Sequence, residues 1–280
     1  MREISCEEIS AAAEMLCIRA ASFLTPDLAM QLECASESEP NPAGRGALED
    51  IVENFTAAGL HRLPVCRRAD VPVVFARIGQ EVHITGGSFA AAVDAGVRRG
   101  YAVAGLCAGA ACAPLCRENA GKNVPAVLHT ELVPGDGLQL TVALTCADCE
   151  NACAVRMFPP GTSREQVEDW IVQTAADAGA RPCPPVVVGV GAGGNFEQAA
   201  LLARRALIRP VDRRSADPFY AAMERRTLAK INRLGIGPRG RGGRTTAVAV
   251  NVETAPAGAA GLPCAVCIGC HATRHADCAL

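Results

Sequence analysis

Apolar and polar positions recur with two different periods along the chain. In the first part, apolar side chains return at helical spacing over residues 7–20, 27–36 and 46–58. A loop segment rich in Ser, Pro, Asn and Gly, residues 37–44, separates the second helix from the third. Residues 1–62 are therefore predicted to form a helical lead-in.

From Val71 onward, short β-branched runs alternate with helical patterns. The runs 71–78 and 81–84 are joined by Gly79-Gln80 and predict a hairpin. Further strands are predicted at 126–132, 138–144, 185–190 and 246–252, and helices at 87–100, 163–178, 196–207 and 218–234. The expected fold is α/β (mixed α+β), a mixed sheet flanked by helices, in a single domain covering residues 1–280.

Composition narrows the class of protein. The chain has 280 residues, half of them hydrophobic, with a formal net charge of −2. That charge gives no general electrostatic attraction to nucleic acid or to an anionic membrane. No uninterrupted apolar stretch is long enough to cross a bilayer. We expect a globular protein that binds neither nucleic acid nor membrane.

Cysteine is the chemically informative residue, with 15 copies. Cys264, Cys267 and Cys270 follow one another at intervals of three, a spacing that places thiolates on one turn around a metal or an iron–sulfur cluster. Isolated cysteines such as Cys17 and Cys34 are better explained as small hydrophobic residues. The acidic N-terminus has no leader pattern, so we expect a reducing, cytoplasmic location without a disulfide framework.

Two further motifs favour anions, and each has an ordinary alternative. The glycine run 189–194, between a predicted strand and helix, could bind phosphate with Asp212 beyond it, although a tight turn also needs glycine. The loop 234–246 carries Arg239, Arg241 and Arg244, which suit a small polyanionic substrate or a solvated surface loop.

A zinc site is a less favoured possibility near the C-terminus. His271 and His275 would face the same way if that segment were helical, and a pair of histidines at this spacing can bind zinc.

A series of longer motifs, in order, resembles a known family. It comprises Glu3-Ile4, Pro64-Val65-Cys66, Pro125-Ala126-Val127-Leu128-His129-Thr130-Glu131, Val133-Pro134-Gly135-Asp136, residues 183–191 from Cys183-Pro184-Pro185, Leu234-Gly235-Ile236-Gly237-Pro238 and Cys270-His271-Ala272-Thr273-Arg274-His275. Together they resemble the α-type subunit or domain of class I fumarate hydratase and L-tartrate dehydratase, over essentially the full chain.

The resemblance implies a hydro-lyase with a [4Fe–4S] cluster held by three cysteines, which match Cys66, Cys183 and Cys270. Its substrate would be a small dicarboxylate of the fumarate, malate or tartrate kind. Arg117 matches a substrate-carboxylate arginine, and Asn119 lies in the same polar loop. In the family the catalytic base comes from a β-type domain, so a β-type partner subunit and a hetero- or homo-oligomer are implied.

The sequence departs from the family around the site. Where the family has Gln-Asp-Thr-Gly after the first cysteine, this chain has Arg67-Arg68-Ala69-Asp70, which leaves Asp70 as the candidate proton-handling carboxylate. The thiols Cys146, Cys149, Cys153, Cys264 and Cys267 stand where the family requires none. The alternative is therefore a non-hydratase iron–sulfur protein with a second cluster, for electron transfer or cluster storage.

Overall fold

The computed structural model describes residues 1–107, Leu115 and 123–280. The described chain forms two compact units, each assembled from segments that are far apart in sequence. The first unit contains Met1–Thr25, Asn54–Ala147 and Arg274–Leu280, and the second contains Pro26–Glu53 and Asp148–Thr273.

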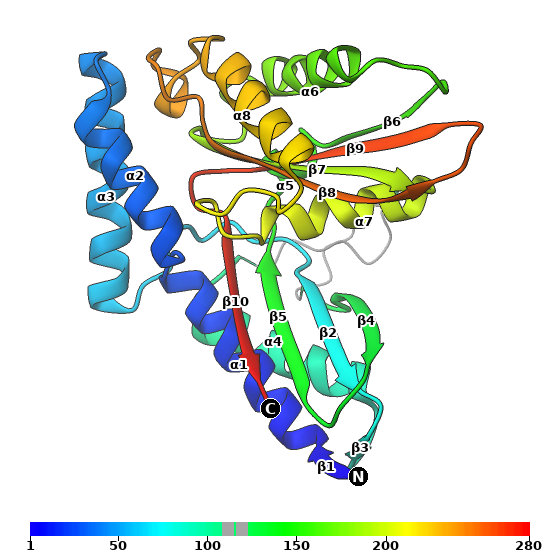
Figure 1. The fold of residues 1–280 in the computed structure, drawn as a ribbon. Coiled ribbons are helices and arrows are strands. Elements are labelled where there is room, and N and C mark those ends of the chain that lie inside the picture. Colours follow the sequence, from blue (N-terminus) through cyan, green and yellow to red (C-terminus); the bar gives the residue numbers. More distant parts are fainter. Residues whose placement is uncertain (108–114, 116–122) are drawn as a thin grey trace. The chain divides into compact units, whose positions relative to one another are not determined.

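The first unit is built on a four-stranded mixed sheet in the order β10 (Arg274–Ala279), β5 (Leu138–Leu144), β2 (Val73–Gly79), β4 (Val127–Val133) (Figure 1). Strand β2 is parallel to β4 and antiparallel to β5. Helices α1 (Cys6–Ser22) and α4 (Phe89–Val103) pack together, and α1 covers β5 and β10. Leu16, Val93 and Val142 are fully buried in the resulting core.

The predicted hairpin between residues 71–78 and 81–84 is wrong. Strand β3 (Val82–Thr85) pairs in parallel with β1 (Arg2–Ser5), a strand that the pattern did not indicate. Both edges of β2 are already occupied by β4 and β5. After β2, the amide of Gln80 donates to Val133 O at 2.9 Å and that of Glu81 to Gly135 O at 3.0 Å. The chain is thereby held to the β4–β5 loop and directed away from β2.

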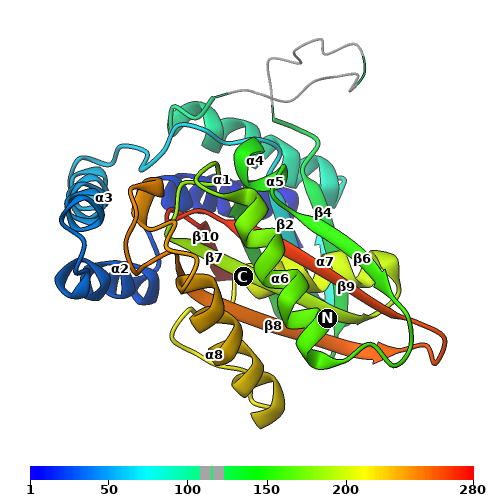
Figure 2. The same cartoon turned by 90° about the horizontal axis from the view of Figure 1, so that it is seen from above.

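The second unit contains another four-stranded sheet, ordered β6 (Ala154–Phe158), β9 (Leu262–Gly269), β7 (Val186–Gly194), β8 (Ala247–Ala257). Helix α7 (Phe196–Leu207) packs on one face, while α6 (Arg164–Ala178) and α8 (Pro218–Asn232) cover the other (Figures 1 and 2). Helix α2 (Pro26–Ser38) also belongs to this unit, and α3 (Pro42–His61) and α5 (Ala147–Glu150) cross the boundary between the units.

The glycine run at 189–194 lies within β7 and does not form the expected loop between strand and helix. Alternate side chains of β7, Val188 and Val190 among them, enter the core on the α6–α8 face. The glycines between them meet α7: a Cβ on Gly191 would lie 2.0 Å from Ala199 O, and one on Gly189 2.3 Å from Ala203 O. Close packing of a helix against a strand therefore explains these glycines, without an anion.

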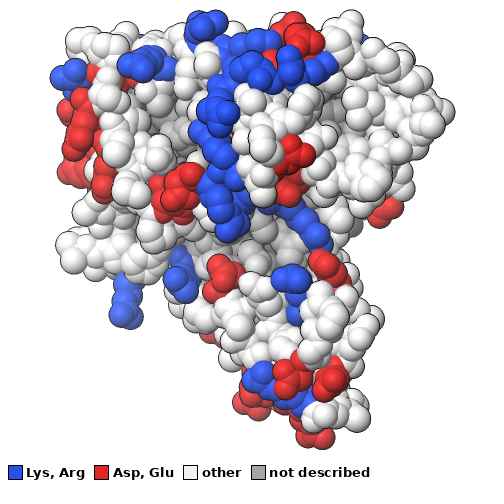
Figure 3. Space-filling view, in the orientation of Figure 1, with Lys and Arg blue, Asp and Glu red and all other residues white. Residues whose placement is uncertain are grey.

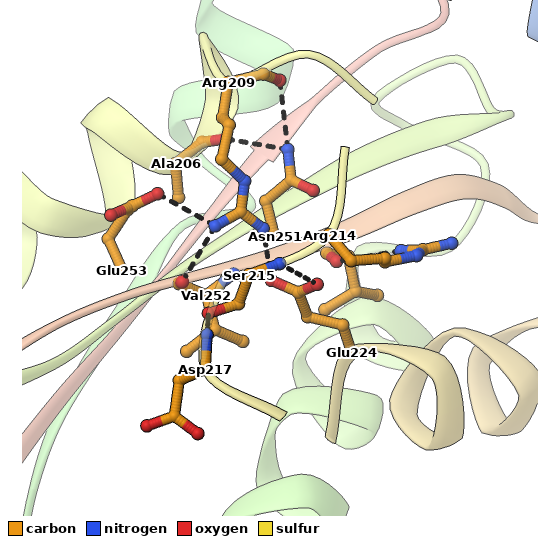
Figure 4. Close-up of polar contacts among 10 residues, drawn as sticks. Ala206, Arg209, Arg214, Ser215, Asp217, Glu224, Asn251, Val252 and Glu253 are labelled. Atoms are coloured by element: carbon orange, nitrogen blue, oxygen red, sulfur yellow. Dashed lines mark hydrogen bonds and ion pairs between the residues drawn. The ribbon is translucent and has the colours of Figure 1, made fainter. Parts of the chain in front are cut away.

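A buried polar network fixes the connection between α7 and α8 (Figure 4). The carboxylate of Glu224 on α8 is fully buried and accepts the amides of Ser215 at 3.0 Å and Val252 at 2.9 Å. Arg209 pairs with Glu224 and also with Glu253, at 2.9 Å. A buried charge is tolerated when it is paired and hydrogen-bonded in this way.

The mixed α/β class and the helical lead-in are confirmed. The three predicted N-terminal helices correspond to α1, α2 and α3, and the later ones to α4, α6, α7 and α8, with ends that differ by a few residues. None of the helices in residues 1–107 and 123–280 combines the length and apolar character needed to cross a membrane.

Candidate metal and substrate site

Cys66 lies in the first unit, on the irregular segment between α3 and β2. The preceding amide, that of Val65, donates to Ala21 O of α1 at 2.9 Å. The guanidinium of Arg274, 3% exposed at the start of β10, donates to the carbonyl of Cys66 and, at 2.5 Å, to that of Arg68. One buried cation thus fixes the backbone on both sides of Arg67.

Every carbonyl oxygen from residue 65 to residue 70 accepts a hydrogen bond. The donors, in order, are Asn54 Nδ2, Arg274, the amide of Cys107, Arg274 again, Asn123 Nδ2 and the hydroxyl of Tyr101. Buried backbone groups are normally satisfied by secondary structure, and here five side-chain hydrogen bonds and one backbone amide replace it. The segment has no helix or strand, yet each of its carbonyl oxygens has a defined donor, which suits a ligand-bearing loop.

Asp70 ends this segment with its backbone held on both sides. Its amide donates to Thr145 O at 3.0 Å, and its carbonyl accepts from the hydroxyl of Tyr101 at 2.8 Å. Burial raises the pKa of Tyr101, so this hydroxyl keeps its proton and stays a donor. The Asp70 side chain is half-buried, whereas Arg67 is exposed and its Nε donates to Gly105 O at 3.0 Å.

Cys183 and Cys270 both belong to the second unit, and His271 connects them. Cys183 is exposed three residues before β7, with a backbone φ of +52°. Its carbonyl accepts the amide of His271 at 3.3 Å and lies 2.8 Å from Nδ1 of the same residue. Because a carbonyl only accepts, Nδ1 carries a hydrogen in this contact. The residue after Cys270 therefore holds the backbone of Cys183.

Cys270 is half-buried in the turn that follows β9. Its carbonyl accepts both the amide of Thr273, at 2.9 Å, and the Thr273 hydroxyl, at 2.7 Å. A Cβ on Gly269 would lie 2.2 Å from that hydroxyl oxygen, so the turn requires glycine there. The helix that would bring His271 and His275 to one face is not formed, because this turn leads directly into β10.

The expected convergence of Cys264, Cys267 and Cys270 on one loop is also wrong. Cys264 and Cys267 lie within β9, where residues three apart point to opposite faces of the sheet. Cys264 is fully buried in the α6–α8 core, and burial raises the pKa of its thiol to about 12. A thiol of that kind is a core hydrophobe rather than a metal ligand.

Cys153 and Cys267 form a separate pair on the other face of the sheet, and Cys149 is buried nearby on α5. Cys146 belongs to the first unit. Among residues 1–107, 115 and 123–280, no three His, Cys, Asp or Glu side chains gather in a group able to hold a metal ion. Within the described chain, the additional thiols therefore give no support to a second cluster, and Cys66, Cys183 and Cys270 do not form such a group either.

The arginines of the loop 234–246 do not converge on one ligand. Arg239 lies 3.5 Å from Asp50, and its amide donates to Pro184 O at 2.8 Å, next to Cys183. Arg244 instead lines a pocket of about 380 Å³, together with Arg214, Arg225 and Arg233. Basic side chains gather around α8 on the face drawn in Figure 3.

Glu39, which the sequence did not single out, holds this loop in place. It is fully buried and accepts the amides of Arg244 at 2.9 Å, Thr245 at 2.9 Å and Asn41 at 3.2 Å. Burial alone would raise its pKa, but these hydrogen bonds outweigh burial and lower it. In the sequence, Glu39 is an acidic residue inside the predicted loop 37–44, and such residues are common on any surface.

Arg117 and Asn119, the predicted substrate-binding residues, lie outside the described residues. Arg274 and His271 were present in a recognised motif, but their roles as supports of Cys66 and Cys183 were not predicted. The sequence held no distinct signal for Arg274, because the strand that it begins also carries His275 and Asp277.

Comparison with known proteins places the chain among the hydro-lyases. The family profile described as fumarate hydratase (fumerase) matches residues 10–279. Since this match covers nearly the whole sequence, the chain belongs to the fumarate hydratase family.

Named relatives agree with this assignment. A protein of Methanocaldococcus jannaschii, designated provisionally as L(+)-tartrate dehydratase subunit alpha, is 34% identical over 263 residues, 92% of each chain. The L(+)-tartrate dehydratase subunits alpha of Escherichia coli strains UTI89 and K12 are each 32% identical over 166 residues, 57% of this chain and 55% of theirs. The chain is thus similar throughout its length to one such subunit and over a shorter region to others.

Proposed function

We propose that this chain is the α-type subunit of an iron–sulfur-dependent hydro-lyase that reversibly hydrates a small dicarboxylate of the fumarate or tartrate kind. Family membership supports the reaction class. The relatives are named as alpha subunits of a tartrate dehydratase, which supports both the substrate class and a β-type partner. The two compact units would act together as one catalytic domain.

Cys66, Cys183 and Cys270 would hold a [4Fe–4S] cluster. The donor set fits, because thiolates are the ligands of iron–sulfur clusters and none of these three side chains is buried in a core. Cys17 and Cys264, by contrast, are fully buried, and burial raises the pKa of each thiol to about 12. With only three cysteine ligands, such a cluster would keep one iron open, and that iron would supply a Lewis acid for the departing hydroxyl.

The single observation that carries the proposal is the pair of supports around the end of β9. In one unit Arg274 binds the carbonyl of Cys66, and in the other His271 binds the carbonyl of Cys183. These two supports are three residues apart in sequence, immediately after Cys270. The same short segment thus specifies the backbone at both distant cysteines, which is how dispersed ligands of one cluster would be organised.

Substrate binding and proton transfer would involve other residues. Arg117 would bind a substrate carboxylate through its planar guanidinium, with Asn119 as a hydrogen-bonding neighbour. Asp70, whose backbone is held on both sides, would handle a proton beside Arg67, since a guanidinium cannot serve as a base. The β-type partner would contribute the remaining acid–base group. A cytoplasmic location fits this proposal, since the exposed Cys34 and Cys107 take part in no disulfide.

The proposal is tested by anaerobic reconstitution of the chain with its partner, followed by assays with fumarate, malate and tartrate. We expect about four irons per chain, as in one [4Fe–4S] cluster, an EPR signal that substrate perturbs, and turnover of at least one acid. Cys183→Ser should lose iron and activity together. Cys34→Ser, which changes an exposed cysteine of α2, should keep both. An inactive complex with a full cluster would contradict the hydro-lyase assignment.

A further inference from the structure

Two thiols of the second unit face each other outside the proposed cluster site. Strands β6 and β9 are antiparallel, with Ala154 opposite Val266. Continuing this register by one residue places Cys153 directly opposite Cys267, at the end of the ladder. Directly opposite residues have Cβ atoms about 4.5–5.5 Å apart, close to the separation that a disulfide requires.

The two side chains are in hydrogen-bond contact, and the backbone of Ile268 also bonds to Cys153. The thiol of Cys153 lies 3.2 Å from the carbonyl of Cys149, which accepts its hydrogen when the thiol is protonated. Cys153 is half-buried, while Cys267 is 6% exposed. The pair is therefore asymmetric: a reagent from solvent reaches Cys153 before Cys267.

Charged neighbours strengthen this asymmetry. Arg204 of α7 is near both sulfurs and pairs with Glu150 at 2.6 Å. The hydrogen bond from Cys267 lowers the pKa of Cys153 and outweighs the opposing effects of burial and Glu150, with Ile268 and Arg204 acting in the same direction. The same hydrogen bond, together with burial, raises the pKa of Cys267. One thiol is thus prepared as a nucleophile and the other stays protonated.

We propose that Cys153 and Cys267 form an oxidisable dithiol site, whose substrate is a peroxide and whose product is a reversible disulfide. The thiolate of Cys153 attacks one peroxide oxygen, the O–O bond breaks, and hydroxide leaves and is protonated to water. Cys153 becomes a sulfenic acid. Cys267 then attacks that sulfur, the S–S bond forms, the S–O bond breaks, and the second water leaves. Two thiols lose two electrons, and one peroxide becomes two waters.

This site is distinct from the cluster ligands. Cys267 precedes Cys270 by three residues but lies inside β9, whereas Cys270 follows the strand. Cys264 supplies a comparison within the same strand, because it points to the opposite face and is buried in the other core. Oxidation would therefore select Cys267 over Cys264.

The test treats the purified full-length chain with a small excess of hydrogen peroxide, alkylates free thiols and identifies linked peptides by mass spectrometry. We expect a Cys153–Cys267 link that dithiothreitol reverses and that persists in Cys264→Ala and Cys66→Ser. In Cys267→Ser, dimedone should label Cys153; in Cys153→Ser, Cys267 should stay unlabelled. Circular dichroism would verify that each variant is folded.

Two results would overturn the proposal. One is wild-type protein in which both thiols remain fully alkylatable after peroxide treatment. The other is equal dimedone labelling of Cys153 and the exposed Cys34 in Cys267→Ser, which would show that oxidation follows general exposure rather than the paired arrangement. The Cys66→Ser variant lacks one proposed iron ligand. If the Cys153–Cys267 link still forms in this variant, its formation does not depend on the cluster.

Discussion

Single residues decide the local backbone around the proposed site, and two of them are buried charges. Arg274 supplies donors to a segment that has no secondary structure, and Glu39 supplies acceptors to another. In both cases one side chain satisfies several backbone groups that would otherwise be costly to bury. Composition and hydrophobic patterning do not show such roles, because they depend on partners that are distant in sequence.

Glu39→Gln should destabilise the protein by about 2 kcal/mol at neutral pH, because an amide replaces a carboxylate that accepts several backbone hydrogens. Urea unfolding monitored by circular dichroism measures this difference. Glu37→Gln, which changes an exposed carboxylate two residues earlier at the end of α2, should leave the unfolding midpoint unchanged.

The pH dependence of this effect has a defined sign. The pKa of Glu39 is lower in the folded protein than in the unfolded chain. Its stabilising contribution is therefore complete above the ordinary carboxyl pKa, near 4.3, and is lost as pH falls through the lowered value. The stability gap between wild type and Glu39→Gln should narrow below about pH 4. A gap that widened in acid would contradict this description of Glu39.

At the scale of elements, the pattern of apolar positions was sufficient to predict most helices and strands. It failed to predict strand pairing where the partner strand is distant in sequence. The strands at 73–79 and 82–85 were found, but their partners were not, since β3 pairs with the N-terminal β1. The glycines of β7 and the cysteines of β9 were predicted to lie in ligand-binding loops, because the same residue types occur both in such loops and inside strands. Only tertiary contacts separate the two cases.

The packing of α7 on β7 gives a direct test at this scale. Gly191→Ala should destabilise the second unit by about 1–3 kcal/mol, since the new Cβ would overlap the α7 backbone at Ala199 and Ala203. Gly258→Ala is the matched control, because nothing lies within 4 Å of its Cβ position. Thermal unfolding of both variants measures the difference. Equal stability of the two would contradict the packing explanation.

For the whole molecule, the central claim is that three cysteines far apart in sequence bind one cluster. The family resemblance identified them, whereas the local spacing of thiols indicated Cys264 and Cys267, which the fold places in β9. The supports provided by Arg274 and His271 could not be predicted, because each reaches a residue more than 80 positions away in the chain. The position of Asp70 was indicated by sequence, but its catalytic role stays a prediction.

The most direct measurement of this claim is anomalous iron density in crystals of the anaerobically purified protein. We predict a single cluster bonded to the sulfurs of Cys66, Cys183 and Cys270, with one iron free of any cysteine ligand. Iron bound by other cysteines, or these three sulfurs too far apart to share a cluster, would contradict the account.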